Sequence, residues 1–175
     1  MSRRLLALLC VIGIGTWRAA AAHSASDAYL SLEVLVPMKA ASGTAGHGQW
    51  DIALRDLDFA LALDANGDGK ITWGEVAARW AEIEHYALAA LQLSRGGRPC
   101  TLAPSRQLIA NHADGAYAAL FFDFSCPSSG GDLVLDYGLF FSIDPSHRGI
   151  LTMRAGTNVA TAVLAPERRH LALGL

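Results

Sequence analysis

The middle of this 175-residue chain is organised by the stretch Asp64-Ala65-Asn66-Gly67-Asp68-Gly69-Lys70-Ile71-Thr72-Trp73-Gly74-Glu75. It matches the twelve-residue EF-hand calcium loop at every constrained position. Oxygen ligands would come from side chains at positions 1, 3, 5, 9 and 12 and from the backbone carbonyl at position 7. The predicted Ca²⁺ ligands are Asp64, Asn66, Asp68, Lys70, Thr72 and Glu75. Because such a loop connects two helices, it predicts a helix–loop–helix unit.

The composition of the loop predicts a modest affinity for calcium. Gly69 permits the sharp turn at position 6, and Glu75 would close the site with both carboxylate oxygens. Three carboxylates with a neutral amide at Asn66 suggest a Kd of roughly 10⁻⁴ to 10⁻³ M, as in extracellular modules. Two other interpretations are a polar turn that binds no metal and a degenerate hand that no longer binds. All four side-chain ligands at positions 1, 3, 5 and 12 are present, which argues against the degenerate hand.

Helical patterns flank the loop on both sides. Asp51 is a plausible N-cap, and leucines at positions 54, 57 and 61 predict a short amphipathic helix. After the loop, apolar residues at positions 76, 80, 83, 87 and 91 predict a longer helix that ends near Ser94, where Gly96-Gly97 stops it. We therefore expect an EF-hand insert over about residues 51–94.

The rest of the chain has the patterns of β-strands. Residues 29–36 alternate between apolar and polar side chains and predict a half-buried strand, whereas residues 40–49 resemble a loop. Five more strands are predicted at residues 107–111, 116–124, 133–143, 150–154 and 158–164. The expected fold class is α+β, an antiparallel β-sandwich with the helix–loop–helix inserted after the first strand and a β-rich part at about 98–165.

The first 22 residues have the features of a secretory signal peptide. Arg3 and Arg4 begin it, residues 5–15 form an apolar run too short to span a bilayer, and four alanines end it. We expect cleavage after Ala22, which leaves one exported domain over residues 23–175 in the periplasm or medium, without a transmembrane helix. An uncleaved membrane anchor is the alternative.

Charge and cysteine content agree with export. The expected signal peptide holds three arginines and no acidic residue, so the formal charge of −2 becomes about −5 after cleavage. That charge argues against nucleic acid or anionic membranes as partners. Cys100 and Cys126 would remain as a pair, and an oxidising compartment predicts a disulfide between them. Two buried free thiols are the alternative.

Several short motifs together suggest a family. They are Ser26-Asp27-Ala28-Tyr29-Leu30, Gly48-Gln49-Trp50-Asp51-Ile52-Ala53-Leu54-Arg55-Asp56-Leu57-Asp58, the calcium loop, Tyr137-Gly138-Leu139-Phe140-Phe141 and Asp144-Pro145-Ser146-His147-Arg148-Gly149. This set resembles the extracytoplasmic N-terminal region of the HupE/UreJ family of bacterial membrane proteins, which are related to nickel and cobalt permeases. The resemblance implies an exported calcium-loop domain that partners a membrane permease or another protein. It does not imply metal transport, because the membrane-spanning part of that family is absent from this sequence.

No nucleophile elbow, zincin helix, phosphate loop or redox cysteine pair predicts an enzyme. The expected function is therefore an exported calcium-binding accessory or interaction module. The alternatives are a detached periplasmic half of a nickel or cobalt transporter-like protein and a periplasmic enzyme.

Cleavage after Ala22 would also give His23 a free amine beside its imidazole, and with His47 it could bind copper or nickel. A histidine left at a frayed terminus is the alternative there.

Overall fold

The computed structural model describes residues 26–35, 43–127 and 130–174. In these ranges strands predominate, and helices are short and few, in agreement with the predicted α+β class. The predicted signal peptide and His23 lie outside the described residues. No helix in the described part of the chain is long and apolar enough to cross a membrane.

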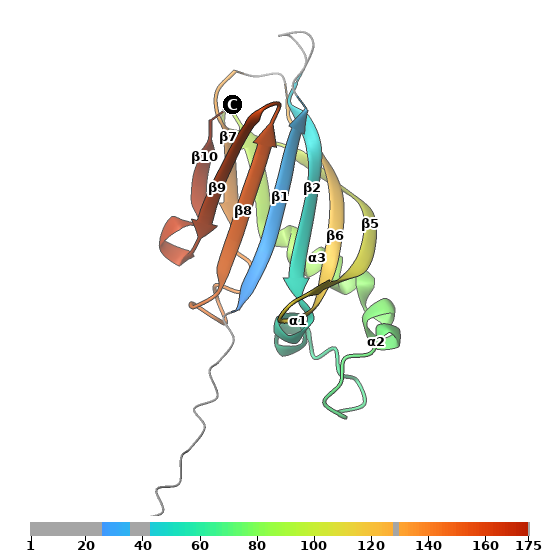
Figure 1. Cartoon of the computed structure of the whole chain (residues 1–175). Coiled ribbons are helices and arrows are strands. Elements are labelled where there is room, and N and C mark those ends of the chain that lie inside the picture. The colour runs from blue at the N-terminus through green and yellow to red at the C-terminus, as the bar shows by residue number, and fades with distance from the viewer. Residues whose placement is uncertain (1–25, 36–42, 128–129, 175) are drawn as a thin grey trace, which may run out of the picture.

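The strands form two sheets (Figure 1). The larger sheet has the order β5-β6-β2-β1-β8-β9 and the smaller one β10-β7-β3-β4. The larger sheet contains β1 (Asp27–Leu35), β2 (Ala45–Ala53), β5 (Thr101–His112), β6 (Gly115–Ser125), β8 (Arg148–Ala155) and β9 (Asn158–Leu164). The smaller one contains β3 (Leu91–Arg95), β4 (Arg98–Pro99), β7 (Leu133–Tyr137) and β10 (His170–Leu173). Strands β1 and β8 pair in parallel, so the expectation of a purely antiparallel fold is wrong for this pair.

Both sheets contribute side chains to one hydrophobic core. On β1 the predicted alternation is confirmed, because Leu30 and Leu32 are buried while Ser31 between them is exposed. The ring of Trp50 on β2 lies 5.4 Å from the ring of Tyr137 on β7, centroid to centroid, which brings the two sheets into direct contact. The strands predicted at 116–124 and 158–164 are confirmed as β6 and β9.

Strand β2 occupies the second half of the segment that we expected to be a loop. Its small and polar residues resemble a turn in the sequence, but Gly46 and Gly48 face the buried rings of Phe124 and Phe122 on β6. A Cβ on Gly48 would lie 2.1 Å from the Cζ atom of Phe122. The glycines are therefore needed for close packing in a central strand, and the expectation of a loop is wrong for residues 45–49.

The helices are shorter than expected and follow β2. Helix α1 (Leu54–Leu61) begins after the N-cap Ala53, so Asp51 is not a cap but a residue of β2. After the loop come α2 (Trp73–Ala78) and α3 (Trp80–Ala89), separated at Arg79, and a 3₁₀ turn, η1 (Pro166–Arg168), lies near the C-terminus.

Two further boundaries differ from the sequence prediction. The helix does not extend to Ser94, because residues 91–95 form strand β3, in which Leu91 and Leu93 are buried and Gln92 between them is exposed. Gly96 and Gly97 then form the turn to β4. The strand expected at 133–143 stops at Tyr137, and a series of turns follows.

The predicted cysteine pair is at disulfide distance. The Sγ atoms of Cys100 and Cys126 lie 2.01 Å apart. The backbone N–H of Cys100 donates to the carbonyl of Leu93 on β3, and that of Cys126 donates to the carbonyl of Thr44, just before β2. The crosslink therefore ties the edge of the smaller sheet to the larger one.

The packing at Gly48 can be tested by adding one methyl group. Gly48→Ala places a Cβ against the ring of Phe122, and we expect it to lower the free energy of unfolding by about 1–3 kcal/mol. Gly130→Ala is the matched control, because a Cβ there meets nothing within 4 Å. Urea denaturation of both variants measures the difference, and equal stability of the two would contradict this account of β2.

The disulfide should contribute strongly to stability. Closing its loop of 26 residues is worth roughly 3 kcal/mol on the chain-entropy model. We expect a Cys100→Ser/Cys126→Ser double variant to lose about that free energy of unfolding. Mass spectrometry of unreduced, alkylated protein checks the bond itself, and alkylation of both thiols in the natively folded protein would disprove it.

Candidate metal centre

The candidate calcium loop lies between α1 and α2 at one end of the molecule (Figure 1). Helix α1 ends at Leu61, and its C-cap is Ala62, a non-glycine residue in the left-handed region with φ 52°. The backbone N–H of Asp64 then donates to Oδ1 of Asp58 at 2.8 Å, one turn back on the helix. This C-cap turns the chain away from the helix axis directly before the first predicted ligand.

The first predicted ligand organises the loop by accepting backbone hydrogen bonds. Oδ1 of Asp64 accepts from the N–H groups of Gly67 and Asp68, and Oδ2 accepts from that of Gly69 at 2.7 Å. Gly67 and Gly69 adopt φ values of 72° and 78°, which glycine allows without strain. Oδ1 of Asn66 and Oδ1 of Asp68 each accept from the N–H two residues ahead. The side chains of Asp64, Asn66 and Asp68 thus hold the backbone of the loop in a turned conformation by accepting its N–H groups.

Glu75 joins the end of the loop to its beginning. Its Oε1 accepts from the N–H of Ala65 at 3.0 Å, and its Oε2 accepts from the N–H and the hydroxyl of Thr72 at 2.9 and 2.7 Å. Thr72 is the N-cap of α2, and the two side chains form a capping box. The hydrogen bonds from Thr72, followed by those from the start of the loop, lower the pKa of Glu75. This carboxylate is therefore ionised at neutral pH.

Arg79 holds the two helices together behind the loop. Its guanidinium donates to the carbonyls of Leu61 and Ala62 at 2.9 and 3.2 Å, which are at the C-terminal end of α1. A cation at this position satisfies helix carbonyls and complements the helix dipole. Arg79 also forms an ion pair with Glu82. The C-terminal end of α2, which Arg79 caps, is thereby held against the C-terminal end of α1, which precedes the loop.

The loop packs against the β-structure through its position 8. Ile71 is partly buried against the core. It also lines a shallow pocket of about 260 Å³ with Arg55 of α1 and residues 114–117 of the β5–β6 turn. The isoleucine at position 8 thus lies beside the turn of the β5–β6 hairpin. The β-structure thus supports the single loop.

The donor set fits calcium in chemistry but is not gathered around one point. Its carboxylate, amide, hydroxyl and carbonyl oxygens are hard ligands of the kind that Ca²⁺ prefers. A carboxylate oxygen can accept more than one hydrogen bond or metal contact, so the backbone bonds do not exhaust these groups. However, no group of three or more His, Cys, Asp or Glu side chains converges as a metal site in the described ranges. The side chains would have to move inward to coordinate an ion.

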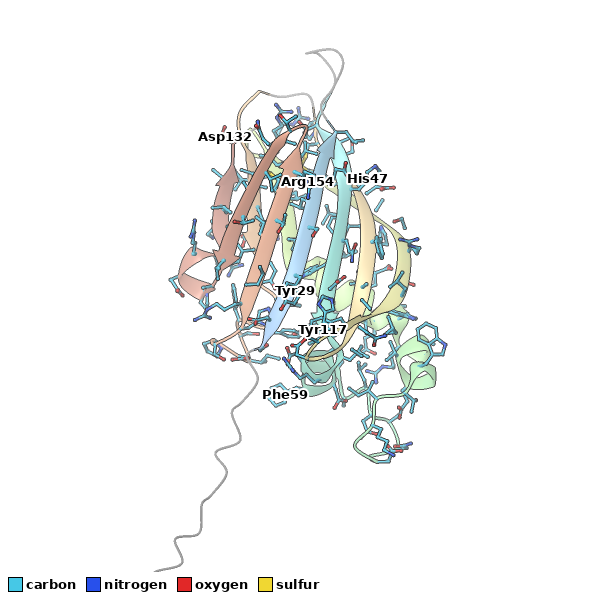
Figure 2. All side chains as sticks on the ribbon, in the orientation of Figure 1. Tyr29, His47, Phe59, Tyr117, Asp132 and Arg154 are labelled. Atoms are coloured by element: carbon cyan, nitrogen blue, oxygen red, sulfur yellow. A yellow bond between two sulfur atoms is a disulfide. The ribbon has the colours of Figure 1, made fainter. Side chains whose placement is uncertain are left out.

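The structure places the other predicted ligand, His47, far from this loop. His47 lies on β2, toward the end of the sheet away from the loop (Figure 2), and its Nδ1 is 2.6 Å from Oδ1 of the exposed Asp123. His23 lies outside the described residues. The hypothesis of a copper or nickel site at His23 and His47 thus gains no further ligand from the described structure.

A buried histidine in the turn before β8 is the centre of a polar network. His147 is 0% exposed. Its Nδ1 lies 2.8 Å from Oγ of Ser26, and its Nε2 lies 2.8 Å from the hydroxyl of Tyr137. The hydroxyl of Ser26 donates to Oδ2 of Asp56 at 2.9 Å. The network therefore joins the chain before β1 to α1, β7 and the turn before β8.

The hydrogen bonds of the network indicate which ring nitrogen of His147 carries the proton. Since Ser26 donates its only hydroxyl hydrogen to Asp56, Nδ1 of His147 must be the donor to Ser26, and its Nε2 accepts from Tyr137. Burial lowers the pKa of His147 to about 4 and raises the pKa of Asp56. A serine, a histidine and an aspartate in contact resemble a nucleophile and its base. Both ring nitrogens of His147 are occupied and the ring has no exposed surface, so this network stabilises the fold by joining four segments of the chain.

Sequence reasoning could not find this network, because its hydrogen-bonded pairs are 10, 30 and 121 residues apart and share no motif spacing. The same holds for Asp51 and His112. Asp51 is 7% exposed, and its Oδ2 lies 2.9 Å from Nε2 of His112, which is at the end of β5. The ring of His112 stacks on Tyr29 and contacts Tyr117.

No protein-family model matches the chain, and no curated protein matches it. The resemblance to the HupE/UreJ family therefore stays a prediction from the motifs.

The lowered pKa of His147 predicts that the folded protein loses stability in acid. Its pKa is about 4 in the folded protein and about 6.5 in an unfolded chain, so the unfolded state binds more protons between these values. Stability should fall as the pH drops from about 6.5 to 4, by up to about 3 kcal/mol from this residue. In His147→Gln, which does not titrate, the fall over this range should be smaller. The control is His85→Gln, at an exposed position on α3, and urea denaturation across the pH range makes the comparison. Parallel pH profiles for His147→Gln and the unaltered protein would contradict the prediction.

Proposed function

We propose that this chain is an exported calcium-binding domain, with one EF-hand loop at residues 64–75 carried on a β-sandwich. The ligands would be the side chains of Asp64, Asn66, Asp68, Thr72 and Glu75 and the backbone carbonyl of Lys70. The domain would serve as an accessory or interaction module. In this account a membrane permease is one candidate partner, as the motif resemblance implies, and another protein is the alternative.

One observation carries this proposal. The carboxylate of Glu75, the last residue of the loop, accepts a hydrogen bond from Ala65, the second residue, while the loop between them turns through two left-handed glycines. The oxygen-bearing side chains thus lie on a short closed loop between two helix ends. Three carboxylates and one lysine leave this loop with a net negative charge, which a divalent cation would neutralise.

The surroundings of the loop support a constitutive site rather than a switch. Arg79 holds the C-terminal end of α2 against the C-terminal end of α1, and Ile71 packs against the β-structure, so binding would require side chains to converge without separating the helices. The Cys100–Cys126 pair supports the exported location, because disulfides persist in oxidising compartments.

Calcium should raise the melting temperature. An ion that binds only the folded chain stabilises it by RT ln(1 + [Ca²⁺]/Kd). For the expected Kd, 10 mM calcium should add about 1.4–2.7 kcal/mol, which corresponds to a rise of roughly 3–10 °C. Glu75→Gln removes a charge and weakens the bidentate ligand, so most of this rise should be lost.

The controls separate binding from general salt effects. Glu167→Gln makes the same charge change at an exposed residue of η1, outside the loop, and should keep the full rise. Magnesium at equal concentration should give a smaller rise, because it prefers a tight octahedral site. If calcium leaves the melting temperature unchanged, or raises it equally in both variants, the proposed site is wrong.

A further inference from the structure

Strand β9 is an unprotected edge of the larger sheet. Among the described residues its only strand partner is β8, so its other side presents backbone groups to which no described strand pairs (Figure 1). Natural sheets usually protect such an edge with a charge, a proline, a bulge or a very short strand. The seven residues of β9, Asn158-Val159-Ala160-Thr161-Ala162-Val163-Leu164, contain neither a charge nor a proline.

The other three edges of the two sheets carry the protection that β9 lacks. Strand β5 contains Pro104 and Arg106, and its register shifts between them. Strand β4 is only two residues long and includes Pro99, and β10 has four residues and begins at His170. Exposed edges are thus guarded elsewhere in this molecule. The composition of β9 is that of a strand that pairs with another strand.

The five central residues of β9 are symmetric about Thr161. Val159-Ala160-Thr161-Ala162-Val163 reads the same in both directions. If two copies pair antiparallel around a twofold axis at Thr161, valine lies opposite valine, alanine opposite alanine and threonine opposite threonine. Identical β-branched residues opposite each other form favourable cross-strand pairs, and a twofold axis is the usual symmetry of a dimer.

The register with β8 defines which side chains meet on each face. Val159, Thr161 and Val163 pair with Arg154, Thr152 and Ile150, respectively, on the outer face of the sheet. Val159 and Val163 are 53% and 48% exposed. Ala160 and Ala162 lie opposite the buried Met153 and Leu151, on the core side. Pairing would cover two exposed valines per copy and bring only small side chains together on the inner face.

We propose that β9 is a dimerisation edge, at which two copies of this chain pair antiparallel with Thr161 opposite Thr161 of the second copy. The larger sheet would then continue across the twofold axis. A second copy fits better than an unrelated strand, because only a second copy gains matched pairs from the symmetric sequence. The edge lies away from the calcium loop, so this proposal does not depend on the proposed function.

Crosslinking tests the register directly. In a Cys10→Ser background, so that no unpaired native cysteine remains, Thr161→Cys places two thiols opposite each other across the axis, roughly 5 Å apart at Cβ. A short bismaleimide should then give a covalent dimer. Val159→Cys alone should not crosslink, because the two copies of residue 159 are four residues out of register, roughly 13 Å along the strands. A mixture of Val159→Cys and Val163→Cys should give the heterodimer.

Charge substitutions test the same contact without crosslinking. Thr161→Lys and Thr161→Glu each bring like charges together at the axis, so each variant alone should lose the dimer in sedimentation velocity, and an equimolar mixture should recover it. Thr152→Lys, one strand inward on the same face, should keep the dimer. The proposal is overturned if the unaltered chain sediments as a monomer at high micromolar concentration. It is also overturned if Thr161→Cys and Val159→Cys crosslink equally.

Discussion

The close packing of two phenylalanine rings on two glycines is the constraint on which the rest of the structure depends. Phe122 and Phe124 of β6 occupy the space that side chains on Gly48 and Gly46 of β2 would need. This packing makes β2 a central strand between β6 and β1. It also determines where α1 starts, because the chain leaves the sheet at Ala53 and the helix begins at the next residue. The position of the candidate calcium loop follows from that exit.

Two other features hold the ends of this arrangement. The disulfide ties the beginning of β5 to the end of β6, next to the edge of the smaller sheet. At the opposite end of β1, the buried His147 network joins Ser26 to α1 and β7. The backbone N–H of Arg148 donates to the carbonyl of Ser26, which places β8 beside β1 in parallel. The single parallel pair thus has a local cause, since the turn carrying His147 must return to the start of β1.

The sequence predicted those elements whose signals are local. Alternation in β1, β6 and β9 and the twelve-residue loop pattern are properties of neighbouring residues, and the structure has a strand or a helix-flanked loop at each place. The errors arise where distant partners decide. In the sequence, Gly46 and Gly48 resemble loop residues, because their contact with the phenylalanine rings of β6 is not visible there. Likewise, Leu91 continues the apolar spacing of a helix, but pairing with β7 makes Leu91 and Leu93 part of a strand. The contacts of His147 and of Asp51 depend wholly on tertiary structure. The loop itself was predictable residue by residue, but the incomplete convergence of its carboxylates was not.

The most direct measurement of the central claim uses the tryptophan at position 10 of the loop. Trp73 is 59% exposed and lies within the proposed site, so it can transfer excitation energy to a terbium ion that takes the place of calcium. The account predicts that excitation of tryptophan gives terbium emission and that added calcium displaces the terbium and removes this emission. Most of the emission should also be lost in Trp73→Phe. It also predicts that Trp73→Phe keeps the stabilisation by calcium. The absence of sensitised emission, or emission that calcium does not displace, would contradict the assignment of residues 64–75 as a calcium site.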